Sequence, residues 1–175
     1  MIERYSRPEM SLIWSEETQY RTWLDIEVLA CEAWATLGKI PEPDMKNIRE
    51  RAGFEVEKIR ETEKKTKHDV AAFVSEVQRV IGASGRFVHM GLTSSDIVDT
   101  AFAYRLKKSA EGILKGLEAC LETTLKRAEE HKQTLMMGRT HGIHAEPMTL
   151  GMKWLLWHDS LQRARKRIEA AKKEI

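Results

Sequence analysis

One repeat in the last part of the chain restricts its fold more than any other feature. From residue 150 to residue 175, apolar side chains recur at alternating steps of four and three, the spacing of a long helix in a bundle. These positions are Leu150, Trp154, Trp157, Leu161, Ala164, Ile168, Ala171 and Ile175. The repeat still runs at the last residue, so we expect the given chain to stop within a helix of a longer protein. Its apolar faces need further helices, so we also expect oligomerisation.

The rest of the sequence also favours helices. It has only four prolines and no sustained alternation of β-branched residues, so we predict an all-α fold. Residues 1–11 are expected to be irregular, and glycines 138 and 142 predict a loop or extended stretch over residues 132–147. The predicted helices are one capped by Ser15 and ended by Gly38, two short ones near Pro43–Ala52 and Glu55–Lys65, one near Asp69–Ile81, and a long one near Asp96–His131 capped by Ser94 or Ser95.

The long helix near Asp96–His131 exceeds what a compact small domain needs. We therefore divide the chain into an N-terminal helical domain, residues 1–111, and the start of a central bundle of long antiparallel helices, residues 112–175. The composition, 42% hydrophobic and 32% charged, is sufficient for a hydrophobic core.

Charge and hydropathy exclude several classes of function. Lysine and arginine total 29 against 27 acids, a formal net charge of +2, which gives no general attraction to nucleic acid or to a membrane surface. There is no charged-then-apolar leader and no apolar run of roughly 18 residues, so we expect a soluble, cytoplasmic protein. Cys31 and Cys120 lie among apolar residues and are interpreted as buried free thiols rather than as a disulfide or a catalytic thiol.

Three of the six histidines lie outside the apolar repeats. His68 precedes Asp69 at a predicted helix start, where the acid can orient the imidazole. A capping Asp69 beside a bystander histidine explains the same residues equally well. His89 opens a segment with the hydroxyls of Thr93 and Ser94 before the long helix, which is either an anion site at a helix start or ordinary capping.

His141 lies in a polar segment between two glycines, which allow a ligand or another backbone to approach closely. A metal site formed by His141 and His144 is a poor alternative, because no third ligand has a matching spacing. Near the start of the chain, the arginines Arg4 and Arg7 and the hydroxyls of Tyr5 and Ser6 suit bidentate contact with a phosphate, although a flexible, solvated terminus explains them as well.

Four segments taken together resemble the adenylosuccinate lyases of the fumarase/aspartase superfamily in their order and spacing. They are Arg4–Met10, Lys67–Val70, His89–Asp96 and Met137–Gly142. The resemblance implies a homotetramer built on a bundle of long helices, with each active site formed by three subunits. It implies elimination of fumarate from adenylosuccinate, giving AMP, and from the succinylated ribotide SAICAR, giving AICAR, in purine biosynthesis. It implies no metal and no organic cofactor.

The resemblance also implies roles for individual residues. His141 is similar to the general acid that protonates the leaving nitrogen, which eases its expulsion. Thr93, Ser94 and Thr140 resemble donors to the succinyl carboxylates, where negative charge accumulates. The resemblance further implies that His68 and Asp69 position the substrate. It implies that Arg4, Tyr5 and His89 contact the nucleotide phosphate. Lys67 is also an implied site residue, and it stands where the family commonly has arginine.

In the family, the serine base lies on a mobile loop that follows this region, so we expect residues 1–175 alone to be inactive. Two alternatives remain open from the sequence. One is another member of the superfamily, such as a carboxymuconate cycloisomerase or an argininosuccinate lyase. The other is a helical interaction module without catalysis, in which the histidines only cap or pack.

Overall fold

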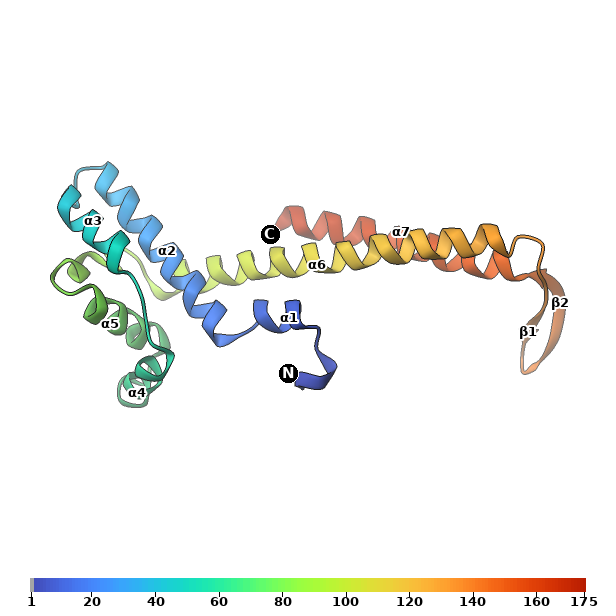
Figure 1. Cartoon of the computed structure of the whole chain (residues 1–175), viewed down its shortest axis with the longest axis horizontal. Helices are drawn as coiled ribbons and strands as arrows, with labels where there is room; N and C mark the ends of the chain where they lie inside the picture. The colour runs from blue at the N-terminus through green and yellow to red at the C-terminus, as the bar shows by residue number, and fades with distance from the viewer. Residues whose placement is uncertain (1) are drawn as a thin grey trace. The chain divides into compact units, whose positions relative to one another are not determined.

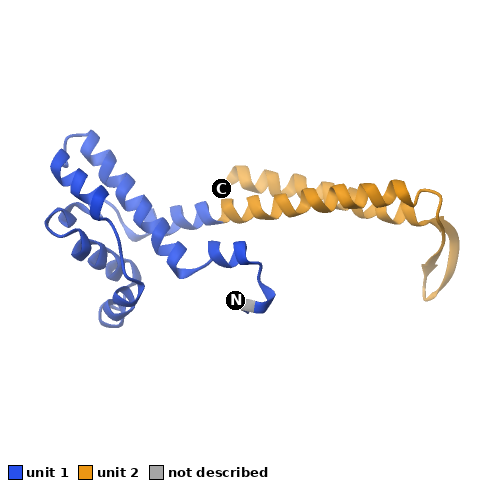
Figure 2. Cartoon of the chain, viewed as in Figure 1, with its two compact units in different colours: residues 1–105 blue, residues 106–175 orange. Residues whose placement is uncertain are grey.

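The computed structural model describes residues 2–175 and divides into two compact units, Met1–Arg105 and Leu106–Ile175, drawn in two colours in Figure 2. In chain order the elements are η1 (Glu3–Tyr5), α1 (Pro8–Ile13), α2 (Glu16–Thr36), α3 (Glu42–Arg51), α4 (Val56–Thr66), α5 (Asp69–Ile81), η2 (Ala83–Phe87), α6 (Ser94–Glu130), β1 (Leu135–Thr140), β2 (Ile143–Thr149) and α7 (Leu150–Glu174) (Figure 1). The helical fold class is confirmed, with one small hairpin added. Since α6 continues through residues 105 and 111, no break marks either position, and the domain boundary after residue 111 stays a prediction.

The irregular opening expected for residues 1–11 is wrong over much of its length. The short helix η1 includes Arg4 and Tyr5, and α1 begins at Pro8. Proline suits the first helical turn because its fixed φ matches the helix and its missing N–H is not needed there. Glu9 adds a favourable acid in that first turn. The signal for α1 was therefore present in the sequence.

The start and end of α2 follow the prediction. The Ser15 hydroxyl accepts a hydrogen bond from the Thr18 N–H at 3.1 Å, which satisfies one of the unpaired donors at the helix start. Beyond the other end, Gly38 has a φ of +70°, a conformation that glycine adopts without steric cost.

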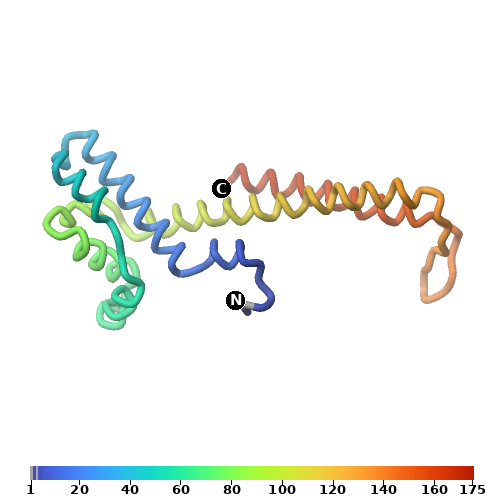
Figure 3. Tube along the Cα trace, viewed as in Figure 1, coloured from blue at the N-terminus to red at the C-terminus, as the bar shows by residue number. Residues whose placement is uncertain are grey.

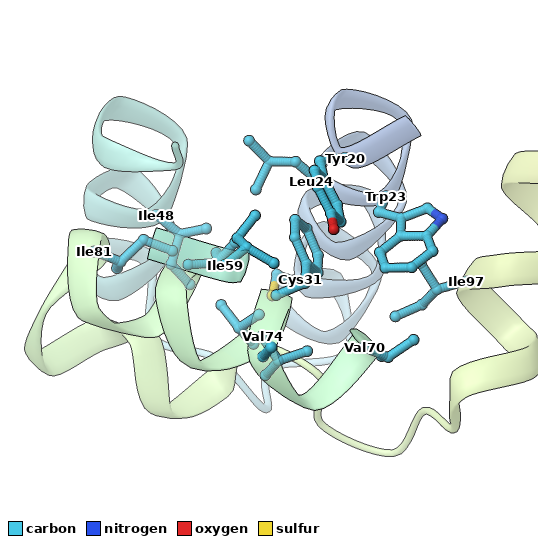
Figure 4. Packing of buried hydrophobic residues seen from close by; sticks show 14 of the residues in the cluster. Tyr20, Trp23, Leu24, Cys31, Ile48, Ile59, Val70, Val74, Ile81 and Ile97 are labelled. Atoms are coloured by element: carbon cyan, nitrogen blue, oxygen red, sulfur yellow. The ribbon is translucent and has the colours of Figure 1, made fainter. Parts of the chain in front are cut away.

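The core of the first unit lies where α2 packs against α5 (Figure 4). The rings of Tyr20 and Phe73 are stacked with centroids 5.8 Å apart, and Trp23 meets Phe73 edge-on at 5.4 Å. Further buried side chains come from α3, α4 and the first turn of α6, namely Met45, Ile48, Ile59 and Ile97. This core fixes the first turn of α5 and the segment before α6, where most of the predicted site residues lie.

In the second unit, α7 runs antiparallel to the part of α6 after residue 105. Ion pairs join Glu118 to Arg165 at 2.9 Å and Glu111 to Lys172 at 3.1 Å. Much of the predicted apolar repeat is only partly covered, and the Trp157 side chain is 49% exposed. Cys31 is buried as expected, whereas Cys120 is exposed, so the prediction of a second buried thiol is wrong.

The segment predicted as a loop or extended stretch forms the antiparallel hairpin β1–β2, whose trace is followed over residues 135–149 in Figure 3. The register shifts between Met137 and Arg139, an irregularity of the β-bulge kind. At Gly138 a Cβ atom would lie 2.8 Å from the Glu146 carbonyl oxygen, so only glycine allows this close approach. The shift, Gly138 and Pro147 interrupt the alternation that would have marked two strands in the sequence.

Among the described residues, no helix combines the length and the apolar character that crossing a membrane requires.

Candidate active site

The predicted site residues occupy three segments of the first unit and one hairpin of the second. In η1, the Arg4 guanidinium donates to the Tyr5 hydroxyl at 3.0 Å and lies 4.8 Å from the centroid of the Tyr5 ring. Both side chains are exposed. This contact holds a cation and a hydroxyl side by side, which suits recognition of a phosphate oxygen.

The second segment joins α4 to α5. Lys67 ends α4 in the left-handed conformation, with a φ of +55°. His68 itself occupies the N-cap of α5, and its Nδ1 accepts a hydrogen bond from the Ala71 N–H at 3.4 Å. The alternative in which Asp69 caps the helix is therefore wrong. The Asp69 carboxylate instead accepts from the Val70 N–H at 2.8 Å and lies 3.5 Å from His68 Nδ1.

This geometry leaves the side chains of His68 and Asp69 both about half exposed, at 52% and 54%. With Nδ1 accepting from the backbone, the neutral imidazole carries its hydrogen on Nε2. The pair thus presents a ring donor and a carboxylate acceptor at the start of one helix, an arrangement that can position a polar substrate group.

The third segment leads into α6. The helix begins at Ser94, so its capping position is Thr93 rather than the predicted Ser94 or Ser95. The Asp96 carboxylate accepts a hydrogen bond from the Thr93 N–H at 2.7 Å, which is one half of a capping box. Thr93 is exposed and Ser94 is half-buried, so their hydroxyls stand at the positive end of a 37-residue helix.

His89, at the start of the same segment, has a buried partner that the sequence did not reveal. Its ring Nδ1 lies 2.7 Å from Oε1 of Glu27, and its backbone N–H donates to Oε2 of Glu27 at 2.8 Å. Glu27 is 1% exposed. A signal existed, because Glu27 lies on the same face of α2 as Trp23, Leu24 and Cys31, where an acid is out of place.

The fourth segment is the tip of the hairpin β1–β2. Thr140 and Ile143 form the last pair of the register, and His141 and Gly142 make the turn with φ values of +51° and +77°. Positive φ at both central residues is what a type I′ turn requires, and histidine enters this region more readily than most residues. Thr140 and His141 are exposed. The turn presents an exposed imidazole and an exposed hydroxyl at the end of two paired strands.

Within each unit, the structure groups Arg4 with Tyr5, Lys67 with His68 and Asp69, and His89 with Thr93 and Ser94, while Thr140 and His141 share the hairpin tip. Among the described residues, no group of three or more histidine, cysteine, aspartate or glutamate side chains is placed to hold a metal ion.

A family profile and individual relatives both match the sequence of this chain over nearly its whole length. The profile of the family described as "Lyase" matches residues 3–175. The chain is 52% identical over 175 residues to the adenylosuccinate lyase of Bacillus subtilis (strain 168), covering 100% of this chain and 41% of that protein. It is 51% identical over 171 residues to the adenylosuccinate lyase of Streptococcus mutans serotype c, covering 98% of this chain and 40% of that protein. The chain thus spans about two fifths of these relatives.

Solved structures with the same fold include other lyases and cycloisomerases. The β-carboxy-cis,cis-muconate cycloisomerase of Acinetobacter calcoaceticus sp. ADP1 matches with a TM-score of 0.87 and 26% identity, over 94% of this chain and 40% of that one. A fumarate lyase from Mesorhizobium sp. BNC1 matches with a TM-score of 0.85 and 28% identity, over 92% of this chain and 39% of that one.

Proposed function

Because this chain belongs to the lyase family that its residues 3–175 match, we propose that the protein carrying it is an adenylosuccinate lyase. The enzyme is a carbon–nitrogen lyase that eliminates fumarate from adenylosuccinate, giving AMP, and from SAICAR, giving AICAR. The observation that carries this proposal is the 52% identity to an adenylosuccinate lyase, which extends over the whole chain.

In this proposal His141 is the general acid. The reaction breaks a bond between carbon and an amine nitrogen, and a proton delivered to that nitrogen makes it a better leaving group. The exposed turn at the hairpin tip supports this role, since it holds the imidazole away from its own strands. Thr140, Thr93 and Ser94 donate hydrogen bonds to the succinyl carboxylates, which gain negative charge once the β-carbon has lost its proton.

The remaining groups hold the substrate in place. His68 and Asp69 position it through the ring donor and the carboxylate at the start of α5. Arg4, Tyr5 and His89 bind the nucleotide phosphate. A guanidinium suits this role because its fork of N–H donors matches the oxygens of a phosphate. Lys67, which precedes His68 at the end of α4, contributes a point charge and cannot make a bidentate contact.

We also propose that the enzyme is a cytoplasmic homotetramer that needs no cofactor and has nucleotides rather than nucleic acid or membrane as its ligands. The apolar side chains that α7 leaves exposed support an assembly of several copies. They include Met152, Leu155, Leu156 and Trp157. Such a row of apolar groups is rare on a monomer and is typical of bundle helices that pack against further helices.

The test uses the complete protein, because the chain spans about two fifths of its relatives. Turnover of adenylosuccinate is followed by absorbance for the wild type and for His141→Gln. We expect kcat to fall by about 100- to 10,000-fold in the variant, the usual contribution of general acid–base catalysis. His131→Gln, at a histidine whose ring contacts Thr134, is the control and should keep wild-type turnover. Equal turnover by the wild type and His141→Gln would reject the assigned acid, and no turnover by either protein would support a non-catalytic helical module.

The structural likeness to a β-carboxy-cis,cis-muconate cycloisomerase raises a second candidate reaction. It is separated from the first by offering both substrates to the wild-type enzyme. Turnover of the carboxymuconate without turnover of adenylosuccinate would replace the proposed function by cycloisomerisation.

A further inference from the structure

The segment that carries His89 rests on one face of α2. Three residues of that helix, Glu27, Cys31 and Trp34, are spaced four and then three apart and hold the segment. Glu27 binds His89, and the Cys31 thiol donates to the Phe87 carbonyl with 3.7 Å between sulfur and oxygen. The Trp34 indole N–H donates to the Met90 carbonyl at 2.8 Å. Residues at this spacing lie on the same side of a helix. The segment is therefore fixed along its length by side chains from a single buried helix face.

The backbone of this segment needs such support. His89 has a φ of +69°, in the left-handed region that costs energy for a residue with a Cβ atom. Gly91 has a φ of +76°, and a Cβ atom there would lie 3.1 Å from the Trp34 ring. The hydrogen bond from the His89 N–H to Oε2 of Glu27 holds the strained residue in place at its own backbone.

Glu27 also fixes the ring of His89. An ionised carboxylate is only an acceptor, so the 2.7 Å contact with Oε1 requires the hydrogen to lie on Nδ1. The His89 side chain is 25% exposed, and its Nδ1 faces a carboxylate that is 1% exposed. The exposed part of the ring is therefore the opposite edge, which includes Nε2. The tautomer and the direction of a histidine ring are commonly set in this way by a partner at the other nitrogen.

The core has no packing reason to place an acid at this position. Burying a carboxylate is costly unless its charge is compensated, and an apolar side chain would serve packing better. Glu76, another buried acid in the same unit, binds the Arg79 guanidinium at 2.8 Å and accepts a hydrogen bond from the Glu55 N–H. Glu27 instead directs both of its oxygens to one residue, His89.

We propose that Glu27 is a positioning residue, which acts through His89. Glu27 accepts from Nδ1–H and turns Nε2 outward, and the doubly protonated ring donates Nε2–H to an anionic group of the substrate. This inference rests on the proposed function for the identity of the substrate. Glu27 itself is buried and touches no ligand.

The test compares Glu27→Gln with the wild type in the complete enzyme. The amide keeps the volume and one acceptor for the His89 N–H, but it offers a donor to the ring, so Nδ1 must become the acceptor. The ring is then neutral and lacks the positive charge that attracts the substrate anion. We expect kcat/KM for adenylosuccinate to fall by about 10- to 100-fold, the range typical when the partner that orients a metal-binding histidine is removed. Glu76→Gln is the matched control for loss of a buried acid. It should keep the wild-type kcat/KM and the wild-type fraction of tetramer.

A double-mutant cycle with His89→Gln separates positioning from a structural role. If Glu27 acts through His89, the double variant is no less active than His89→Gln alone. Losses that multiply in the double variant would overturn the proposal. If Glu27→Gln does not fold, the same cycle is run with Glu27→Asp, which keeps the charge.

A second measurement is independent of the reaction. In the protein labelled with ring ¹⁵N-histidine, the shifts report which ring nitrogen carries a hydrogen, and His89→Gln identifies the signal. We expect a protonated Nδ1 at His89 in the wild type and an unprotonated one in Glu27→Gln. An unprotonated Nδ1 in the wild type would refute the positioning role. Absence of adenylosuccinate turnover with the expected ring state would instead refute only the proposed function.

Discussion

Replacing Phe73 by alanine tests the core that holds the first unit together. The ring is 0% exposed and contacts Tyr20, Trp23 and Phe54 with centroids 5.8, 5.4 and 6.2 Å apart. Truncating a buried phenylalanine removes its burial and leaves a cavity, at a cost of about 3 to 5 kcal/mol. We expect the upper half of that range, because each lost aromatic pair adds about 0.5 to 1.5 kcal/mol beyond area. This is a large share of the roughly 5 to 15 kcal/mol that stabilises a typical domain.

The assay is equilibrium unfolding in urea, followed by far-UV circular dichroism and by tryptophan fluorescence, since Trp23 lies edge-on to the deleted ring. With a slope of about 2 kcal/mol per molar urea, the midpoint should fall by about 2 M at an unchanged slope. Phe102→Ala is the matched control, because it deletes the same atoms from a side chain that is 50% exposed and meets only the Trp14 ring among the aromatic contacts described. Its midpoint should fall by about 0.5 M, from a loss of about 1 kcal/mol.

Equal shifts for the two variants would refute the packing of α2 against α5. Because α5 begins with Asp69 directly after His68, the same result would also remove the physical basis for a rigid start of that helix. A larger shift for Phe73→Ala with a changed slope would indicate a change in the compactness of the unfolded or native state, or unfolding that is no longer two-state.

Two further predictions concern helix packing and pH. At Gly151 a Cβ atom would lie 2.6 Å from the Ala128 carbonyl oxygen, so Gly151→Ala should lower the stability of the α6–α7 pair by about 1 to 3 kcal/mol. The control Gly116→Ala, whose Cβ would meet nothing within 4 Å, should raise the stability by about 0.5 to 1 kcal/mol. Urea midpoints that move in the same direction for both variants would contradict this prediction. Burial, with smaller contributions from nearby acids, raises the pKa of Tyr20 to about 12 from its usual value of about 10. Because the pKa of Tyr20 is higher in the folded state, the neutral phenol contributes stability that is complete below pH 10 and is lost as the pH rises to about 12. The free energy of unfolding of the wild type should therefore fall over this pH range, and that of Tyr20→Phe should fall less.

Much of the helical architecture could be read from the sequence. The bounds predicted for α5 agree with the structure at both ends, since Asp69 opens the first turn and Gly82 follows the last. Where prediction failed, the local signals were mixed. Pro8 was read as part of an irregular opening, although it starts α1. The hairpin was missed because Gly138 and a register shift break the alternation of its first strand.

The candidate site was predicted as residues rather than as contacts. The sequence singled out His68, His89 and His141 because they stand outside the apolar repeats. It did not reveal that His68 caps α5 by its own ring, nor that Glu27 holds His89 from 62 residues away in the chain. Their roles in catalysis stay predictions, as does the domain boundary after residue 111.

The sequence by itself determined the periodic features of this protein: where helices form, which faces are apolar, and the four segments that relate it to a family. These follow from interactions between residues a few positions apart, which local patterns record. Only the tertiary structure decided which buried acid meets which imidazole and which ring nitrogen faces it. Such contacts join residues on different elements, and their energies depend on burial and distance, which no local pattern specifies.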